Sequence, residues 1–246
     1  MESWSRTVKS EFTTIQRPKI WLSWSSGKDS YATLEYLRAE NRYHVEAMFT
    51  VIDPVKDQVP MHAVSAELIH RQADALGLQL HLSKLDANAP AEFIRPLLDT
   101  ARQEDVRFFA FGDLFLEDIR QYREKNMVNT GIGTLFPLWQ QPTGELIQNL
   151  IGSGMRAIIT SVDLKALPAS FLGRELTLEV VEQITALGND PCGENGEYHS
   201  FVFDGPLFHH PVTFVTGDPV VKDGFGHLSL KSAEDNSSVL PSSSFG

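Results

Sequence analysis

The residues most suited to chemistry form one short run, Ser25-Ser26-Gly27-Lys28-Asp29-Ser30, directly after an apolar segment at residues 20–24. We expect a strand to end there and a helix to begin near Ser30, so that free backbone N–H groups and the positive end of the helix dipole meet in the loop. Gly27 permits a close backbone approach or a positive φ, Lys28 supplies a cation, and the serine hydroxyls supply donors. Together these groups predict a polyphosphate site. A Ser-rich turn that caps a helix without a ligand is the alternative.

A second group of ionisable residues lies far along the chain, in the Gly-containing stretch at 191–199. Glu194, Glu197 and His199 have no packing reason to cluster there, so we treat them as catalytic candidates. They would hold Mg²⁺, orient a substrate or move a proton from an attacking amine. The alternative is an exposed acidic turn. Cys192, in the same stretch, is interpreted as a small loop residue rather than a nucleophile.

Three further positions are candidates for nucleotide binding, because they follow the last apolar run of the first half of the chain. Gly112 and Asp113 come directly after that run, where ligand contacts are expected, although Asp113 would serve equally as a helix N-cap. Arg120 lies seven residues further on and is a candidate for phosphate contact, the alternative being a charged helix face. His62 follows a Pro-containing loop, and the favoured interpretation of it is a surface histidine.

The segments that must position these groups alternate between strand and helix patterns from residue 19 to residue 112. Short runs rich in β-branched and aromatic residues predict strands, and apolar residues at helical spacing predict the helices between them. This alternation is typical of a parallel sheet covered on both faces, a doubly wound Rossmann-like α/β domain that binds its ligand at the carboxyl ends of the strands. The expected strands are 20–24, 45–52, 78–82 and 106–111, and the expected helices are 30–40, 68–76 (ended by Gly77) and 93–101.

After residue 126 the pattern changes, and we predict a second, smaller α/β domain. Its expected elements are helices at 143–151 and 176–187 and strands at 157–162, 199–203 and 212–215. The predicted organisation is an N-terminal extension at 1–18, a nucleotide-binding domain at 19–126, a substrate-site domain at 127–230 and a disordered, Ser-rich tail at 231–246.

Composition argues against proteins that coat nucleic acid, span a membrane or depend on disulfides. The 246 residues carry a formal net charge of −11, which argues against a nucleic-acid-coating surface. No apolar run reaches the roughly 20 residues that a membrane helix needs, so no membrane partner is expected. A single cysteine excludes an intramolecular disulfide and favours a cytoplasmic setting. A homo-oligomer is left open.

Leu22 and Asp29 occupy positions where a Walker-type P-loop needs a glycine and a Ser or Thr, so that motif is excluded. The 25–30 run instead resembles the Ser-Gly-Gly-x-Asp-Ser loop of the adenine nucleotide alpha hydrolase superfamily. It departs from that pattern at Ser26, which is tolerable if the φ of Ser26 is negative. Further segments, in order along the chain, resemble the diphthine–ammonia ligase family: Gly112-Asp113, Phe136-Pro137-Leu138-Trp139, Phe171-Leu172-Gly173-Arg174 and Pro191 to Tyr198, followed by Phe201-Val202.

The resemblance implies an AMP-forming ligase that uses ATP and Mg²⁺ to join ammonia or an amine to a small-molecule or protein-borne carboxylate. Lys28 would neutralise phosphate charge, and Asp29 would orient the loop or help hold Mg²⁺. His199 stands where family members tend to carry a glutamate, so the chain looks like a side branch of the family, and the resemblance supports the chemistry better than the identity of the substrate. The alternatives are a nucleotide sensor without turnover, and a tRNA-thiolation or sulfur-nucleotide-reducing enzyme, which the single cysteine and acidic charge disfavour.

Overall fold

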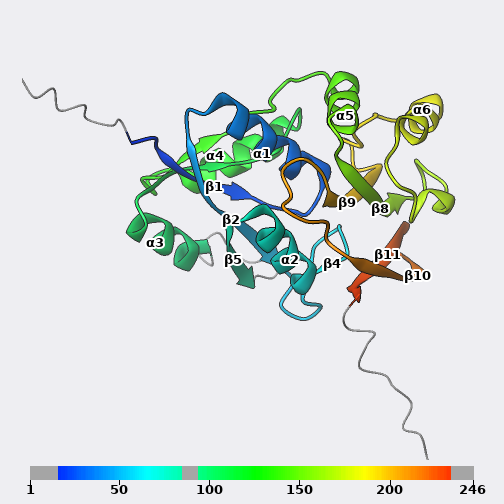
Figure 1. Ribbon diagram of the computed structural model, residues 1–246, viewed down its shortest axis with the longest axis horizontal. Helices are drawn as coiled ribbons and strands as arrows, with labels where there is room; N and C mark the ends of the chain where they lie inside the picture. The colour runs from blue at the N-terminus through cyan, green and yellow to red at the C-terminus, as the bar shows by residue number, and fades with distance from the viewer. Residues whose placement is uncertain (1–15, 85–93, 234–246) are drawn as a thin grey trace, which may run out of the picture.

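The computed structural model describes residues 16–84 and 94–233, and its first sheet is parallel throughout. The strand order is β5-β2-β1-β6-β7, with helices packed on the sheet (Figure 1). This confirms the predicted α/β class with a parallel sheet. The strands are β1 (Lys19–Ser23), β2 (His44–Ile52), β5 (Gln79–Lys84), β6 (Val106–Ala110) and β7 (Gly133–Leu135).

The strand order creates a switch point beside β1. The chain passes from β1 outward through β2 to β5, then returns to place β6 on the opposite side of β1. In an open parallel sheet, a crevice forms at the carboxyl ends of the strands where the order reverses in this way. The loop that follows β1 therefore lies at the position that the fold reserves for a ligand.

Four helices connect these strands, and local sequence explains where they begin and end. The side chain of Ser65 accepts a hydrogen bond from Leu68 N at the start of α2, and Gly77 ends that helix with a left-handed φ of 65°, as predicted. Pro96 occupies the first turn of α3, where its missing N–H costs nothing. The helices are α1 (Lys28–Glu40), α2 (Ala66–Leu76), α3 (Arg95–Gln103) and α4 (Glu117–Met127). The predicted contribution of Phe93 to α3 lies outside the described residues.

The second sheet is mostly antiparallel, with the order β3-β4-β11-β8-β9 and with β10 paired to β11. Helices α5 and α6 and strands β8 and β9 match the predicted segments to within a few residues. The strand predicted at 212–215 overlaps only the start of β10, and β3, β4 and β11 were not predicted. The bounds are β3 (Gln58–Val59), β4 (Val64–Ser65), α5 (Thr143–Gly152), β8 (Arg156–Asp163), η2 (Ala169–Phe171), α6 (Leu178–Ala186), β9 (Tyr198–Asp204), β10 (Phe214–Lys222) and β11 (Phe225–Ser232).

The two sheets exchange segments across the predicted boundary at residue 126. Strand β7 comes after that boundary but pairs with the first sheet, and β3 and β4 come before it but join the second. The division into domains stays a prediction. Strand β11 includes residues 231 and 232 of the predicted tail, and residues 234–246 lie outside the described part, as do residues 1–15 of the N-terminal extension.

One large core joins the two sheets, and a smaller one covers the other face of the first sheet. The large core contains Leu22 of β1 together with Ile159 of β8 and Phe201 of β9. The smaller core surrounds Trp21 and Phe109. Because the sheets share a core, strand β9 is held against the loop after β1. Among helices in the described ranges, none combines the length and apolar character needed to cross a bilayer.

Candidate active site

The loop after β1 (residues 25–30, the 25–30 loop) is fastened to the second sheet by buried hydrogen bonds. Val202 N of β9 donates to Ser26 O at 3.0 Å, and Lys28 N donates to Ser200 Oγ at 3.3 Å. The Gln72 side-chain amide donates both to Ser26 O at 3.1 Å and to Val202 O at 2.6 Å. Trp24 Nε1 in turn donates to Gln72 Oε1 at 2.8 Å. The loop geometry therefore depends on β9 and α2 as much as on its own sequence.

The backbone of the 25–30 loop differs from the sequence expectation at two positions. Ser26 has a φ of 76°, so the expectation of a negative φ is wrong: a serine occupies a left-handed position that favours glycine. Gly27 has an extended φ of −92° and is needed instead for close approach. A Cβ on Gly27 would lie 3.0 Å from His62 Cε1 and 3.1 Å from Ser200 O.

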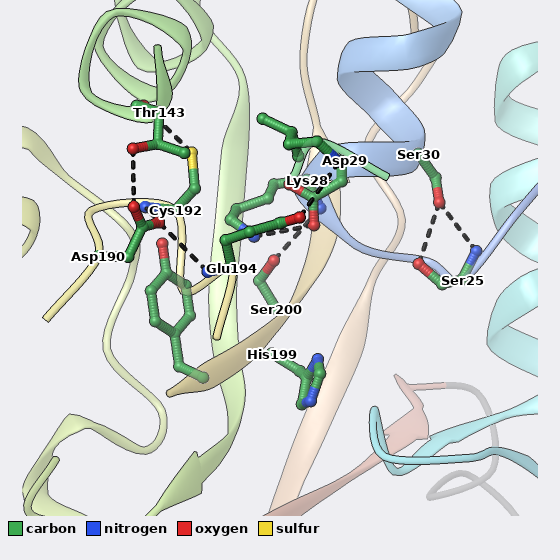
Figure 2. Close-up of polar contacts among 12 residues, drawn as sticks. Ser25, Lys28, Asp29, Ser30, Thr143, Asp190, Cys192, Glu194, His199 and Ser200 are labelled. Atoms are coloured by element: carbon green, nitrogen blue, oxygen red, sulfur yellow. Dashed lines mark hydrogen bonds and ion pairs between the residues drawn. The ribbon is translucent and has the colours of Figure 1, made fainter. Parts of the chain in front are cut away.

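Lys28 is buried and is not a solvated surface lysine. Its side chain is only 4% exposed, its Nζ lies 2.9 Å from Asp29 Oδ2, and it sits over the Tyr198 ring, 5.1 Å from the centroid (Figure 2). Burial alone would lower the pKa of Lys28, but the negative charges of Asp29 and Glu194 outweigh it and raise that pKa above its ordinary value. The ammonium group is therefore charged at neutral pH.

Several polar groups of the 25–30 loop have no protein partner. The first-turn N–H groups of Asp29 and Ser30 meet no acceptor in the described part of the chain, as is usual at a helix N-terminus. Asp29 Oδ1 and Ser26 Oγ are buried and likewise unpaired there. Ser30 Oγ is used internally, since it accepts from Ser25 N at 3.0 Å. Free N–H donors beside a fixed ammonium suit an anion, and the free carboxylate oxygen suits a cation.

Glu194 is half-buried and reaches across to the loop after β6, so the exposed-turn alternative is wrong for it. Its Oε1 accepts hydrogen bonds from Leu114 N at 3.2 Å and Phe115 N at 3.1 Å. Burial is the largest influence on its carboxyl group and raises the pKa of Glu194, and the charge of Asp29 adds to that rise. Glu194 thus brings a carboxylate with a raised pKa beside Lys28 and Asp29.

Glu197, which was expected to be catalytic, uses both carboxylate oxygens in hydrogen bonds within its own loop. It is 7% exposed, and it accepts hydrogen bonds from Asp190 N at 3.1 Å, Asn195 N at 2.9 Å and Asn195 Nδ2 at 3.0 Å. Burial opposes its charge, yet these donors lower the pKa of Glu197 below its ordinary value. Its side chain ties together the 190–199 loop, and it is absent from the described lining of the cavity. Its position therefore gives no support to the predicted catalytic role, and its contacts suit a residue that positions the loop.

Two histidines meet at the edge of the site. The rings of His62 and His199 have their centroids 4.7 Å apart, and His62 Nδ1 lies 3.3 Å from Ser200 O. Burial, with the nearby charge of Lys28, lowers the pKa of His62 to about 4. Burial also lowers the pKa of His199 well below its ordinary value, helped by His62 and Lys28. The favoured interpretation of His62 as a surface histidine is wrong.

Of the three predicted site residues after β6, Gly112 and Asp113 face the site and Arg120 does not. Gly112 lies so close to α1 that a Cβ there would come within 2.9 Å of Asp29 O. Asp113 is not a helix N-cap, because Leu116 holds that position; it pairs instead with Arg123, with 2.5 Å between Nε and Oδ2. Arg120 contacts Glu124 and stacks on Phe136 and Trp139, outside the cavity lining.

These segments enclose one cavity of about 470 Å³. The cavity joins the 25–30 loop, the end of β6 and the 190–199 loop. Figure 2 shows Lys28 and Asp29 of the first loop beside Glu194 of the last. The predicted site residues that line it are Ser25, Lys28, Asp29, Ser30, Gly112, Asp113, Glu194 and His199. Sequence reasoning missed the lining residues Met61, His62, Arg123 and Tyr198. The only feature of the sequence that could have pointed to Arg123 is its place three residues after Arg120, on the same face of the expected helix.

The described residues contain no group of three His, Cys, Asp or Glu side chains placed to form a metal-ligand set. Mg²⁺ usually takes one or two protein carboxylates and completes its shell with phosphates and water, which is a role that Asp29 Oδ1 fits. The buried Cys192 thiol donates to Thr143 O at 3.2 Å, and burial raises its pKa to about 12. Cys192 is therefore held as a thiol, as expected of a packing residue.

Comparison with known proteins covers both halves of the chain. Residues 19–133 match the family described as the diphthamide synthase N-terminal domain, and residues 142–234 match the diphthamide synthase C-terminal domain. The diphthine–ammonia ligase of Danio rerio is 29% identical over 209 residues, which is 74% of this chain and 82% of that protein. The ligase of Rattus norvegicus is 30% identical over 124 residues, covering 48% of this chain and 46% of the relative.

The diphthine–ammonia ligase of Schizosaccharomyces pombe is 32% identical over 102 residues, 40% of this chain but only 16% of the relative. The matched stretches thus span less than half of the yeast and rat proteins. Among solved structures, a U34-tRNA thiolase from Methanococcus maripaludis is similar over 55% of this chain and 56% of the other, at 15% identity and a TM-score of 0.35, a likeness too weak to carry an argument. Both domain matches belong to one family and occur in its order. The chain is a member of the diphthine–ammonia ligase (diphthamide synthase) family.

Proposed function

We propose that this protein is an ATP-dependent, AMP-forming ligase that joins ammonia or an amine to a carboxylate substrate. The observation that carries the proposal is the single cavity in which the 25–30 loop faces Glu194 and His199 from a segment about 165 residues later. The curated relatives bear the name diphthine–ammonia ligase, which supports the same class of reaction. A cytoplasmic setting and Mg²⁺ as cofactor belong to this proposal.

The 25–30 loop would hold the triphosphate. The unpaired N–H groups of Asp29 and Ser30 and the positive end of α1 suit phosphate oxygens. Lys28 is fixed by Asp29 and Tyr198 and would lie ready to neutralise charge that develops on the leaving pyrophosphate. A fixed charge in a cavity screened from water acts more strongly than a mobile lysine on the surface, and it needs no reorganisation during the reaction.

Mg²⁺ would supply further positive charge, because the lining carries more carboxylates than cations. Asp29, Asp113 and Glu194 face only Lys28 and Arg123, and the two cations are each already paired with an aspartate. A triphosphate added to this set meets net negative charge unless a divalent cation accompanies it. Asp29 Oδ1, buried and unpaired in the described part of the chain, is the protein ligand that we assign to that ion.

The proposed reaction has two steps. A carboxylate oxygen of the substrate attacks the α-phosphorus of ATP, the new C–O–P linkage forms, and pyrophosphate leaves. The nitrogen lone pair of ammonia or an amine then attacks the acyl carbon, the C–O bond to AMP breaks, and the nitrogen loses a proton. The products are an amide, AMP and pyrophosphate. The protein contributes mainly position and charge stabilisation to both steps.

The test is release of AMP and pyrophosphate from Mg·ATP over a panel of carboxylic acids with ammonium chloride. Lys28→Met keeps the volume of the side chain and removes its charge, and we expect it to slow AMP release by about 100-fold or more. The matched control is Lys165→Met at an exposed position away from the cavity, which should change the rate less than twofold. Thermal unfolding of both variants separates loss of chemistry from loss of fold. Full activity in Lys28→Met would exclude this site, and ATP binding without turnover on any acid would favour a nucleotide sensor.

A further inference from the structure

The segment that carries His62 is held in an unusual backbone conformation. Met61 has a φ of 65° and Ala63 a φ of 56°, so left-handed residues flank the histidine on both sides, and neither is a glycine. Residues other than glycine rarely adopt this region, and such positions gather at functional sites where the surrounding structure enforces them. The paired turns direct the one side chain between them, His62, into the wall of the cavity.

The contacts of His62 fix which ring nitrogen carries the proton. Its Nδ1 lies 3.3 Å from the carbonyl oxygen of Ser200, and because a carbonyl only accepts, Nδ1 must be the donor. In a neutral ring Nε2 then keeps its lone pair. The ring packs so closely on Gly27 that a Cβ there would lie 3.0 Å from His62 Cε1. No described residue donates to Nε2, so this acceptor is available to a ligand.

The surroundings keep the ring in its proton-accepting form. The groups that face it are the Lys28 ammonium, the His199 ring and the Ser200 carbonyl, of which only the carbonyl favours an imidazolium, and burial outweighs it. Burial and the Lys28 charge hold the pKa of His62 at about 4, so it stays neutral at the pH of the cell. His199, whose pKa is also lowered by burial, lies 4.7 Å away between ring centroids and offers a second neutral imidazole beside the first.

We propose that His62 is a catalytic residue, and that its Nε2 accepts the proton of the amine that attacks the activated acyl group. This rests on the proposed ligase function. As the C–N bond forms and the C–O bond to AMP breaks, the attacking nitrogen becomes positively charged and strongly acidic. Its proton passes to Nε2 and then to water, and the electron pair of the broken bond leaves with AMP. The proton is transferred as the C–O bond breaks, when the nitrogen is that of an N-protonated amide and can lose its proton even to a weak base. A positioned base typically contributes about 10²- to 10⁴-fold.

The kinetic test compares the two half-reactions in His62→Asn, using the panel acid that gives the fastest AMP release. Asparagine retains an N–H near the position of Nδ1 for Ser200 O but has no basic nitrogen. We expect amide formation from ammonium chloride to slow about 100-fold while acid-dependent ATP–pyrophosphate exchange falls less than threefold. His70→Asn, at an exposed position on α2, is the control and should leave both rates unchanged. Added imidazole should restore part of the amide-forming rate in His62→Ala.

A second measurement does not depend on the acid. Nitrogen NMR of the histidine rings should show His62 neutral at pH 7 with the proton on Nδ1, and an Nε2–H tautomer or an imidazolium would overturn the proposal. Equal loss of both half-reactions in His62→Asn would make the residue structural. If no acid in the panel supports AMP release from the wild type, the ligase function fails, and this step fails with it. If AMP release is normal but His62→Asn forms amide at the wild-type rate, only the role of His62 is refuted.

Discussion

Replacing Ser26 with glycine should make the protein more stable, although the serine is completely buried. Ser26 has a φ of 76°, and its hydroxyl is buried without a partner in the described structure. Relief of the left-handed backbone is worth about 1–2 kcal/mol, and removal of an unpaired buried hydroxyl about 1–3 kcal/mol. Against this, glycine adds roughly 0.5–1 kcal/mol of chain entropy in the unfolded state, and the lost methylene costs roughly 0.8 kcal/mol.

At the midpoints of these ranges the balance is a gain of about 2 kcal/mol in the free energy of unfolding for Ser26→Gly. For a chain of this size that corresponds to a rise of roughly 4–8 °C in Tm, measurable by calorimetry. Asn129→Gly is the matched control. Asn129 is exposed and has a φ of 62°, so this variant measures the gain in stability from relieving the left-handed backbone alone, with no buried hydroxyl removed. Its gain should be smaller, since asparagine tolerates this region.

The same variant tests the role of the serine hydroxyl. Ser26 is absent from the described lining of the cavity, so ATP affinity should change less than twofold in Ser26→Gly. A variant that unfolds more easily than the wild type would refute the strain argument. A large loss of ATP affinity at unchanged stability would show instead that the unpaired Ser26 hydroxyl is reserved for the ligand.

Three further changes follow from the same geometry. Glu197→Ala removes the acceptor for three N–H groups of the 190–199 loop, so urea unfolding should show a loss of about 2–3 kcal/mol; unchanged stability would contradict the positioning role. Between pH 7 and pH 5 the free energy of unfolding of the wild type should fall by about 2 kcal/mol through His62. The pKa of His62 is about 4 in the folded protein and about 6.5 in the unfolded chain, so the unfolded chain binds the proton first as the pH falls. In His62→Asn the free energy of unfolding should fall by about 2 kcal/mol less over the same range. Gly112→Ala places a Cβ 2.9 Å from Asp29 O, so it should lower the free energy of unfolding by about 1–3 kcal/mol and weaken ATP binding measured by calorimetry. Gly152→Ala, at a position with no atom near the added Cβ, should change neither quantity.

Local sequence was sufficient to predict four of the five strands of the first sheet, all but β7, and it singled out the 25–30 loop as a polyphosphate site, which stays a prediction. Strand and helix patterns depend on side-chain periodicity along a single segment, and the first turn of any helix leaves N–H groups unpaired. That is why β1, β2, β5, β6 and their helices were predicted to within a few residues. The short strands β3 and β4 carry no periodic signal in two residues each, and only pairing with β11 makes them strands.

What tertiary structure alone decided is which side chains share the cavity. Glu194 and Glu197 are three residues apart and chemically alike. Glu194 lies near Lys28, whereas Glu197 accepts hydrogen bonds from the backbone of its own loop. The turn between them, closed by the bond from Gly196 N to Gly193 O, separates the two side chains. The pairing of His62 with His199 joins residues 137 positions apart, because the turn between β3 and β4 packs directly on β9, and no local pattern encodes that contact. Sequence periodicity records what each segment prefers by itself, whereas the site is made by segments that meet only after the two sheets close on a common core.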